Sequence, residues 1–345
     1  MESIDFSKLD KVFIIAELSA NHNGRLETAI ETIRAAKRAG ADAIKLQTYT
    51  ADSMTINSSK INFTINNGSI WDGKSFYELY QEAHTPWEWH PRLFEVAKEE
   101  GLICFSSPFD KKSVDFLHNL KVPCYKIASF EITDIPLIEY VASKGKPIIL
   151  STGIARFEDI ELALKTIRSI SDIQIVLLKC TSSYPTPLEE ANLAMIPEFE
   201  NYFGVIPGLS DHTLGSTAPI VATCLGAKII EKHFILDRSI GGPDASFSLD
   251  EKEFTQLVKD IRSAEVAIGK VGYTLSKNQE KARDFSRSLF IIKDVDDGEI
   301  IDHTNVRSLR PNAGIAPKNL PLILGKKFKG TYTKGTPLQE KMFYD

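Results

Sequence analysis

The sequence predicts an α/β fold: a (β/α)8 TIM barrel followed by a small β-rich domain. Eight short apolar runs alternate with longer segments whose apolar residues recur at helical spacing. Most of the runs are apolar on both sides, as expected for parallel strands covered by helices. The chain of 345 residues can hold a barrel of about 250 residues and a small partner. Because no GxGxxG motif follows the first run, a doubly wound open sheet is less favoured.

The predicted strands and helices follow one another over roughly residues 10–270. The expected strands are 12–17, 43–47, 102–106, 124–127, 147–150, 173–179, 203–206 and 227–231. The expected helices are 26–39, 86–100, 111–119, 136–143, 157–169, 217–225 and 252–268. Several helices end at a glycine, which is common at helix C-termini, as at Gly40, Gly101 and Gly226. This order is typical of a barrel built from repeated βα units.

The remaining segments predict a covering loop, a linker and a second domain. Residues 48–75 form an unusually long connection after the second strand, and connections of this length are uncommon unless functional. We therefore expect this loop to cover a substrate. Residues 273–287 are polar and charged and predict a linker after a barrel domain of residues 1–272. Residues 288–345 contain short β runs and turn signals and predict a small domain.

Composition and charge narrow the class of protein. The net charge of −5 argues against nucleic-acid binding, which needs a basic excess or a basic stripe. The N-terminus is acidic and its apolar run at 12–16 is too short for a signal peptide, and no run is long enough to span a membrane. Four cysteines, Cys104, Cys124, Cys180 and Cys224, lie far apart without a CxxC pair. We expect free thiols and a cytoplasmic protein.

Every predicted strand ends in polar residues, and strand ends of a barrel converge on one mouth. Two of these residues are lysines, Lys45 and Lys126. Four are serines that could donate hydrogen bonds: Ser107, Ser129, Ser151 and Ser210. This combination suits a small polyanion that carries phosphate and carboxylate groups. A single serine of this kind is more often a helix N-cap, so the prediction depends on the set.

Two histidines and three carboxylates complete the predicted mouth. His212 and His233 follow adjacent strands, which lie about 5 Å apart, so both imidazoles could bind one metal ion. Two histidines without a nearby cysteine suit a catalytic divalent ion, not a closed structural zinc site. Glu17, Glu131 and Asp244 are candidates for proton transfer or for binding sugar hydroxyls. For either histidine alone, a structural role is the more common one.

These residues lie in segments that resemble the sialic acid synthase family along nearly the whole chain. The segments are IAELSANHNG (15–24), IKLQTY (44–49), SSPF (106–109), YKIASFE (125–131), LSTG (150–153), KCTSSYPTP (179–187), GLSDHT (208–213), EKHF (231–234) and GGPDASFSL (241–249). The C-terminal segment resembles the antifreeze-like (SAF) domain of these enzymes, including its RPNAG turn.

The resemblance implies a transferase that condenses phosphoenolpyruvate with an amino-sugar aldehyde. It implies a domain-swapped homodimer in which Arg310 of one subunit reaches the mouth of the other. Phosphoenolpyruvate would be held by Lys45, Ser107, Lys126, Ser129, Ser151 and Ser210. The metal, Mn²⁺ with Mg²⁺ or Co²⁺ as alternatives, would be held by His212 and His233. The other substrate contacts would come from Gln47, Phe109, Glu131, Tyr184 and Asp244, with Glu17 supporting the catalytic centre.

Two features resemble the pseudaminic acid branch of this family. They are the segment 71–90 and the FSL that follows GGPDAS. The expected sugar is then 2,4-diacetamido-2,4,6-trideoxy-L-altrose, and the N-acetylneuraminate and legionaminate branches are the alternatives. Ser182 stands where the neuraminate branch commonly has asparagine, which disfavours that branch.

Two functions of other classes remain as alternatives. A Schiff-base class I aldolase also uses a strand-end lysine, but the paired histidines and the second lysine argue against it. A non-catalytic sugar-binding protein would not need so complete a set of strand-end groups.

Overall fold

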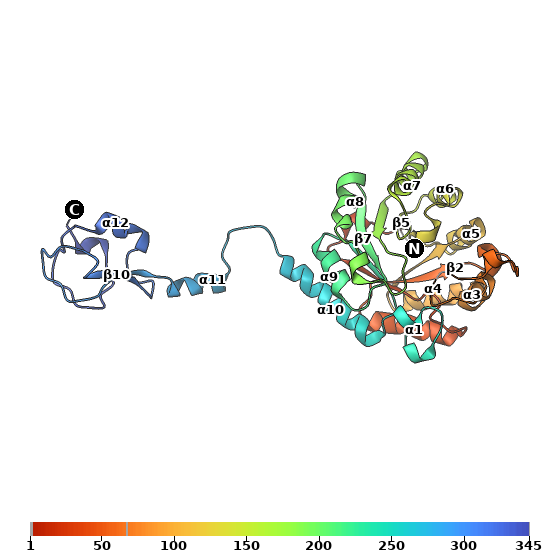
Figure 1. Ribbon diagram of the computed structural model, residues 1–345, viewed down its shortest axis with the longest axis horizontal. Helices are drawn as coiled ribbons and strands as arrows, with labels where there is room; N and C mark the ends of the chain where they lie inside the picture. Colours follow the sequence, from red (N-terminus) through yellow and green to blue (C-terminus); the bar gives the residue numbers. More distant parts are fainter. Residues whose placement is uncertain (1–2, 67, 345) are drawn as a thin grey trace. The chain divides into compact units, whose positions relative to one another are not determined.

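The computed structural model describes residues 3–66 and 68–344. The chain divides into two compact units, Met1–Gly269 and Lys270–Asp345. The first unit is a closed barrel of parallel strands in which β8 pairs with β1 (Figure 1). The strands are β1 (Phe13–Glu17), β2 (Ala43–Thr48), β3 (Ile103–Pro108), β4 (Tyr125–Ile127), β5 (Ile148–Ser151), β6 (Ile175–Lys179), β7 (Ile206–Asp211) and β8 (Ile229–His233). The predicted TIM barrel is confirmed.

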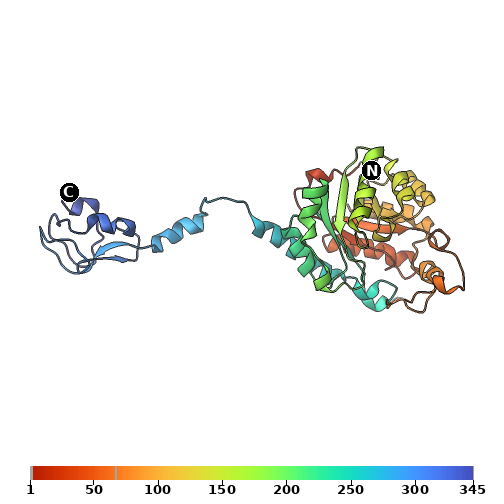
Figure 2. The same cartoon turned by 45° about the horizontal axis from the view of Figure 1, so that its top comes forward.

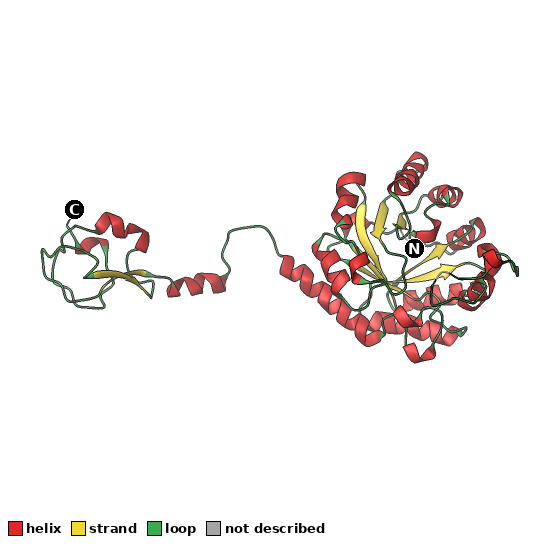
Figure 3. Ribbon diagram, viewed as in Figure 1, coloured by secondary structure: helices red, strands yellow, loops and turns green. Residues whose placement is uncertain are grey.

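Helices cover the outside of this barrel, drawn red around the yellow strands in Figure 3. They are α1 (Leu26–Arg38), α4 (His90–Glu99), α5 (Lys111–Asn119), α6 (Ile135–Ala142), α7 (Phe157–Ile170), α8 (Met195–Phe203), α9 (Thr217–Cys224) and α10 (Glu251–Ile268). Local sequence fixes several of their starts. In α10, for example, Asp250 and Glu253 form a reciprocal capping box that satisfies backbone N–H groups of the first turn. None of the helices in the described part of the chain has the length and apolar content to span a bilayer.

Side chains along each strand point alternately to the helices and to the barrel interior. On β1, for example, Ile14 and Ala16 pack in the layer between strands and helices, whereas Phe13 and Ile15 pack inside the barrel. Phe6, from the short helix before β1, packs edge-on against Phe13 at the N-terminal end of the interior. Apolar side chains therefore fill the interior from that end.

The structure corrects the prediction for the seventh strand, which was placed at 203–206. Residue 203 instead ends α8, and Gly204 terminates that helix with a φ of 62°. The strand β7 starts at Ile206 and continues through Pro207-Gly208, a pair that reads as a turn signal in the sequence. Gly208 is required inside the barrel, since a Cβ there would lie 2.8 Å from the Ile229 carbonyl oxygen.

The long connection after β2 is partly ordered into secondary structure that the sequence did not predict. It contains α2 (Ala51–Met54) and a 3-10 turn, and an isolated bridge joins Thr64 to Ser75. The helix α3 (Phe76–Ala83) follows directly. Both helices start at capping boxes, which explains why short helices form there.

The second unit has a small core of its own. Its two strands, β9 (Ser288–Ile291) and β10 (Val306–Leu309), pair antiparallel, and Leu289 and Ile291 pack there with Phe328. The helix α12 (Leu320–Ile323) lies in the same unit. Before β9, the predicted linker contains a helix, α11 (Lys277–Ala282), and every residue from 266 to 287 is exposed. Figure 2 shows the elements of each unit from a second direction.

Candidate active site

The inward alternation of the strands places polar groups at the C-terminal end of the barrel interior. On β1 the inward series is Phe13, Ile15 and Glu17, and on β8 it is Ile229, Glu231 and His233. The strand register then brings these ends together. Glu17 is aligned with Lys45 on one side and with His233 on the other. Ser210 is aligned with Glu231 in the same way.

These strand ends line a cavity of about 480 Å³. The cavity brings together all the predicted site residues of the first unit except one. They are Glu17, Lys45, Gln47, Phe109, Lys126, Ser129, Glu131, Ser151, Tyr184, Ser210, His212, His233 and Asp244. Residues that lie on the eight strands or in the loops after them, and residues of the long segment after β2, thus meet in one place.

Two predicted residues lie elsewhere. Ser107 is buried, and its hydroxyl has no hydrogen-bond partner among the described residues, but it does not line the cavity. In the strand register, Ser107 is the partner of Gln47, and Gln47 does line the cavity. Ser107 is therefore next to a lining residue. Arg310 is exposed and belongs to the second unit, directly after β10.

The floor of the cavity is a buried network of two lysines and two glutamates. We call Glu17, Lys45, Lys126 and Glu231 the charged floor. Lys45 Nζ lies 3.0 Å from Glu17 Oε1 and 2.9 Å from Glu231 Oε1, and Lys126 Nζ lies 3.7 Å from Glu231 Oε1. All four side chains are buried. A buried charge is tolerated when it is paired, and here the formal charges cancel.

Each charge in the floor shifts the pKa of its neighbours. Burial opposes ionisation of Glu231, but Lys126 and Lys45 outweigh it and lower the pKa of this carboxyl. In Glu17, burial is likewise outweighed, by His233 and the two lysines, and its pKa is lowered. Burial lowers the pKa of Lys126, whereas Glu17 and Glu231 overcome the effect of burial and raise the pKa of Lys45. Lys126 lies farther from Glu231 than Lys45 does. An added anion would therefore be stabilised most by Lys126.

Serine hydroxyls beside the floor are arranged to donate hydrogen bonds. Lys126 Nζ donates to Ser151 Oγ at 2.7 Å, and Gly153 N donates to Ser129 Oγ at 3.0 Å. Because both oxygens already accept a hydrogen bond, their O–H groups can point to a ligand. Ser210 Oγ instead donates to Glu231 Oε1 at 2.9 Å. Ammonium and hydroxyl donors on a buried surface match the oxygens of a phosphate or a carboxylate.

The two imidazoles present one free nitrogen each. His212 Nδ1 lies 3.1 Å from the Thr181 carbonyl oxygen, which can only accept, so this nitrogen carries the proton and Nε2 is free. His233 Nε2 lies 3.2 Å from Glu17 Oε2, and its Nδ1 is buried without a hydrogen-bond partner among the described residues. The ring centroids are 5.3 Å apart. Burial lowers the pKa of His233, whereas in His212 the effect of burial is outweighed by Cys180, which raises the pKa of that imidazole.

This donor set fits a divalent metal ion. A histidine ligand usually has its second nitrogen beside a carbonyl or carboxylate, and here His212 Nδ1 lies beside the Thr181 carbonyl and His233 Nε2 lies 3.2 Å from Glu17 Oε2. Among the described residues no group of three or more His, Cys, Asp or Glu side chains could hold an ion by itself. Two imidazoles would therefore leave positions on the ion for substrate or water.

Two carboxylates at the rim differ in their surroundings. The pKa of Glu131 is raised to about 7, mainly by burial, and its Oε2 atom has no partner in the described part of the chain. Asp244 accepts hydrogen bonds from the Ser19 hydroxyl and, at 3.4 Å, from Ala20 N. Glu131 is thus poised to exchange a proton near neutral pH, whereas Asp244 is held in place.

Sequence reasoning missed several residues that line the cavity. Glu231 was recognisable, since it stands two residues before His233 on the same strand and must share its inward direction. Ser19 gave no signal; it adopts a φ of 49°, which is rare for a residue other than glycine. The apolar and aromatic residues from the segment 49–83, such as Trp71 and Tyr80, were also missed.

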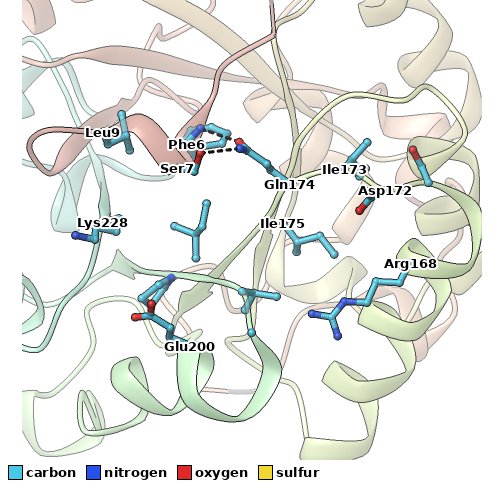
Figure 4. A pocket seen from close by; sticks show the side chains of 15 residues that line it. Phe6, Ser7, Leu9, Arg168, Asp172, Ile173, Gln174, Ile175, Glu200 and Lys228 are labelled. Carbon is cyan, nitrogen blue, oxygen red and sulfur yellow. Dashed lines mark hydrogen bonds between the residues drawn. The ribbon is translucent and has the colours of Figure 1, made fainter.

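A second hollow lies at the opposite end of the barrel (Figure 4). It measures about 780 Å³ and is lined by the starts of β6 and β7 and by residues around Phe6. Gln174 joins its parts by accepting from Phe6 N at 2.8 Å and donating to Ser7 at 3.3 Å. No predicted site residue lies there, and the N-terminal face of such barrels serves stability.

Comparisons with known proteins show the family of this chain. The chain is 47% identical to a pseudaminic acid synthase from Campylobacter jejuni over 99% of this chain and all of that protein. It is 48% identical to a pseudaminic acid synthase from Helicobacter pylori over 94% of this chain and 96% of that one. The crystal structure of an N-acetylneuraminic acid (sialic acid) synthetase from Leptospira borgpetersenii, with citrate, matches with a TM-score of 0.71 and 30% identity, over 79% of this chain and 90% of that one. Residues 286–343 match the SAF domain and residues 32–273 match the NeuB family, and the chain belongs to the NeuB family.

Proposed function

We propose that this protein is a pseudaminic acid synthase. It condenses phosphoenolpyruvate with 2,4-diacetamido-2,4,6-trideoxy-L-altrose and water, and it releases phosphate. The observation that carries the choice of branch is the identity of 47% to a pseudaminic acid synthase along almost the whole chain, against 30% to an N-acetylneuraminic acid synthetase. The charged floor and the donor serines supply the anion site that phosphoenolpyruvate needs.

Phosphoenolpyruvate is held over the charged floor. Lys126 and the hydroxyls of Ser129 and Ser151 bind its phosphate and carboxylate oxygens, because these groups are buried and aimed into the cavity. Lys45 remains bound between Glu17 and Glu231 and adds a fixed positive charge. The fixed floor holds carbon 3 of the enol towards the aldehyde, so proximity supplies part of the acceleration.

The reaction forms a bond between carbon 3 of phosphoenolpyruvate and the aldehyde carbon. Water then adds to carbon 2, and the carbon–oxygen bond to phosphate breaks. Glu131 is the residue best suited to carry a proton in these steps, since its pKa is raised to about 7 by burial. Asp244, fixed by Ser19, orients the sugar through its hydroxyl groups.

His212 and His233 hold a divalent ion, which we propose is Mn²⁺, with Mg²⁺ and Co²⁺ as alternatives. When bound, such an ion acts as a Lewis acid on a carbonyl oxygen. Glu17 and the Thr181 carbonyl fix the two rings by accepting from the nitrogens that face away from the ion. His233→Ala should lower the Mn²⁺ content of the purified protein, measured by mass spectrometry, whereas the exposed His118→Ala should leave it unchanged. Full metal content in His233→Ala would contradict the assignment.

Arg310 enters the site from a second subunit in a domain-swapped homodimer. The residues 266–287 are exposed and carry large apolar side chains, including Val266, Val271, Tyr273 and Phe285. A row of exposed apolar side chains of this kind is typical of a surface that another chain covers. Arg310 itself is exposed, so it is free to contact a ligand of the partner's barrel.

A mixing experiment tests the shared site. Lys126→Met and Arg310→Ala each inactivate a homodimer. In mixed dimers, however, the barrel of the Arg310→Ala subunit is intact and receives Arg310 from its partner. Co-expression in equal amounts should restore about a quarter of the wild-type activity, because half of the dimers are mixed and each has one complete site. No restoration, in mixtures shown to contain mixed dimers, would contradict a shared site.

We also place the protein in the cytoplasm, a proposal supported by its cysteines, which are all free. The catalytic proposal is tested by phosphate release from phosphoenolpyruvate with Mn²⁺ and each of three sugars. These are the trideoxy-altrose, its legionaminate-pathway counterpart and N-acetylmannosamine. Release with the trideoxy-altrose alone is the expected result. Release with another sugar only would move the protein to another branch, and no release with any of them would refute the proposed function.

A further inference from the structure

The cavity has two unlike walls. Besides the charged floor, a largely apolar group of residues lines the cavity, and we call this group the roof. It consists of Tyr49, Met54, Ile65, Trp71, Phe76, Leu79, Tyr80 and Phe109. All of these residues except Phe109 come from one continuous stretch of chain, the segment 49–83 that follows β2. The floor is therefore built by the barrel strands and the roof by a single connection.

The roof is a packed surface and not a loose flap. Tyr49 is buried and contacts Tyr80 and Phe109 edge-on, with ring centroids 5.7 Å and 5.1 Å apart. Ile65 and Leu79 are also buried. Trp71 is tied to the opposite side of the cavity, because its Nε1 donates to the Pro243 carbonyl oxygen at 3.0 Å. Because these contacts fix the roof before a substrate arrives, the shape of the roof can select substrates.

The roof carries no charged side chain among the described residues that line the cavity. The lysines there, Lys45 and Lys126, both belong to the floor. Among the described residues that line the cavity, the polar side-chain groups of the segment 49–83 are the hydroxyls of Tyr49, Ser69 and Tyr80 and the indole N–H of Trp71, which already donates to Pro243. A phosphorylated or highly hydroxylated group placed against this wall would lose its hydrogen bonds with water and gain few in return. The roof therefore fits methyl groups.

Phosphoenolpyruvate offers no methyl group, so the roof faces the sugar. The trideoxy-altrose carries three methyl groups, one at carbon 6 and one on each acetamido group. N-acetylmannosamine carries one, and has hydroxyl groups at carbons 4 and 6. We propose that the roof is the specificity element of this site, which selects an amino sugar by its deoxy methyl and acetamido methyl groups. This inference rests on the proposed function, because it assumes that a sugar occupies the space above the floor.

The test exchanges apolar roof residues for polar ones of similar shape. Met54→Gln and Leu79→Gln insert an amide into the roof, and Met54→Leu and Leu79→Met are the matched controls that keep it apolar. Binding of the trideoxy-altrose and of N-acetylmannosamine is measured by calorimetry without phosphoenolpyruvate, so that no turnover is needed. The Michaelis constant for phosphoenolpyruvate and the melting temperature are measured for every variant that turns over.

We expect each glutamine variant to weaken binding of the trideoxy-altrose by about 10-fold or more, the size of effect that one methyl contact has on selectivity. Binding of N-acetylmannosamine should change less, the controls should stay within about 3-fold of wild type, and the Michaelis constant for phosphoenolpyruvate should not change. The inference would be overturned if the glutamine and control variants lost affinity for the trideoxy-altrose equally, or if neither lost affinity. It would also be overturned if the wild-type protein bound neither sugar. Methyl-dependent binding without phosphate release would uphold the roof and refute the proposed reaction.

Discussion

Replacing Lys126 by methionine is the most direct test of the charged floor. The change removes one buried ammonium group and keeps a side chain of similar length. Lys126 Nζ lies 3.7 Å from Glu231 Oε1, a looser ion pair than the one at 2.9 Å between Lys45 and Glu231, so a bound anion would meet a positive charge that is less closely neutralised. Two unit charges about 4 Å apart attract by about 4 kcal/mol at an effective dielectric constant near 20. The loss of a charged hydrogen bond alone costs about 1.5–3 kcal/mol.

These two magnitudes bracket the expected effect. A loss of about 1.5–4 kcal/mol corresponds to a decrease of about 10- to 10³-fold in kcat/KM for phosphoenolpyruvate. Stability should change much less, because burial already disfavours the charged ammonium and lowers the pKa of Lys126. Lys45 would still neutralise part of the charge on Glu231 at 2.9 Å.

The assay is phosphate release at saturating sugar, with phosphoenolpyruvate varied. Lys179→Met is the matched control, since Lys179 also ends a strand but does not line the cavity. We expect the control to keep kcat/KM within about 3-fold of wild type. If Lys126→Met lost less than about 3-fold while remaining folded, the floor would not be the phosphoenolpyruvate site.

Three further predictions follow from the same geometry. Burial raises the pKa of Glu131 to about 7, so kcat/KM should show a limb near pH 7 that Glu131→Gln abolishes; a limb that persists would contradict proton transfer by this residue. His22 and His90 are buried with pKa values lowered to about 4, so the unfolded state binds more protons below pH 6.5. The free energy of unfolding, measured with urea, should then fall by about 3 kcal/mol per histidine between pH 6.5 and 4, and an unchanged stability would refute this. Gly153→Ala would place a Cβ against Ser182 and 2.7 Å from Ser129 Oγ, and should raise the Michaelis constant for phosphoenolpyruvate more than Gly272→Ala, where a Cβ meets open space.

The barrel and its mouth were predictable from the sequence for a physical reason. Interior and exterior side chains alternate along each strand, so an apolar run that ends in Lys45 or His233 indicates where those side chains point. Because all strand ends of a barrel converge, residues far apart in the sequence could be assigned to one place. Glu231 obeys the same rule and could have been included.

The parts that escaped prediction depend on interactions that no local pattern encodes. The predicted seventh strand, 203–206, begins at the last residue of α8 and stops before Pro207-Gly208, a pair that resembles a turn, whereas Gly208 packs against the carbonyl of Ile229 inside β7. The segment 48–75 was expected to cover a substrate and does line the cavity, but which of its residues form the roof depends on contacts such as Trp71 to Pro243, which are 172 positions apart in the chain. The left-handed conformation of Ser19 is likewise set by tertiary contacts, including its bond to Asp244.

The separation of floor and roof has a consequence for protein engineering and for divergence within the family. The groups proposed for bond making lie on the barrel strands or directly after them, and most of the groups proposed for choosing the sugar belong to one contiguous stretch, 49–83. An exchange of that stretch alone, by recombination or by a designed graft, would retarget the enzyme to a new aldehyde while leaving its chemistry untouched.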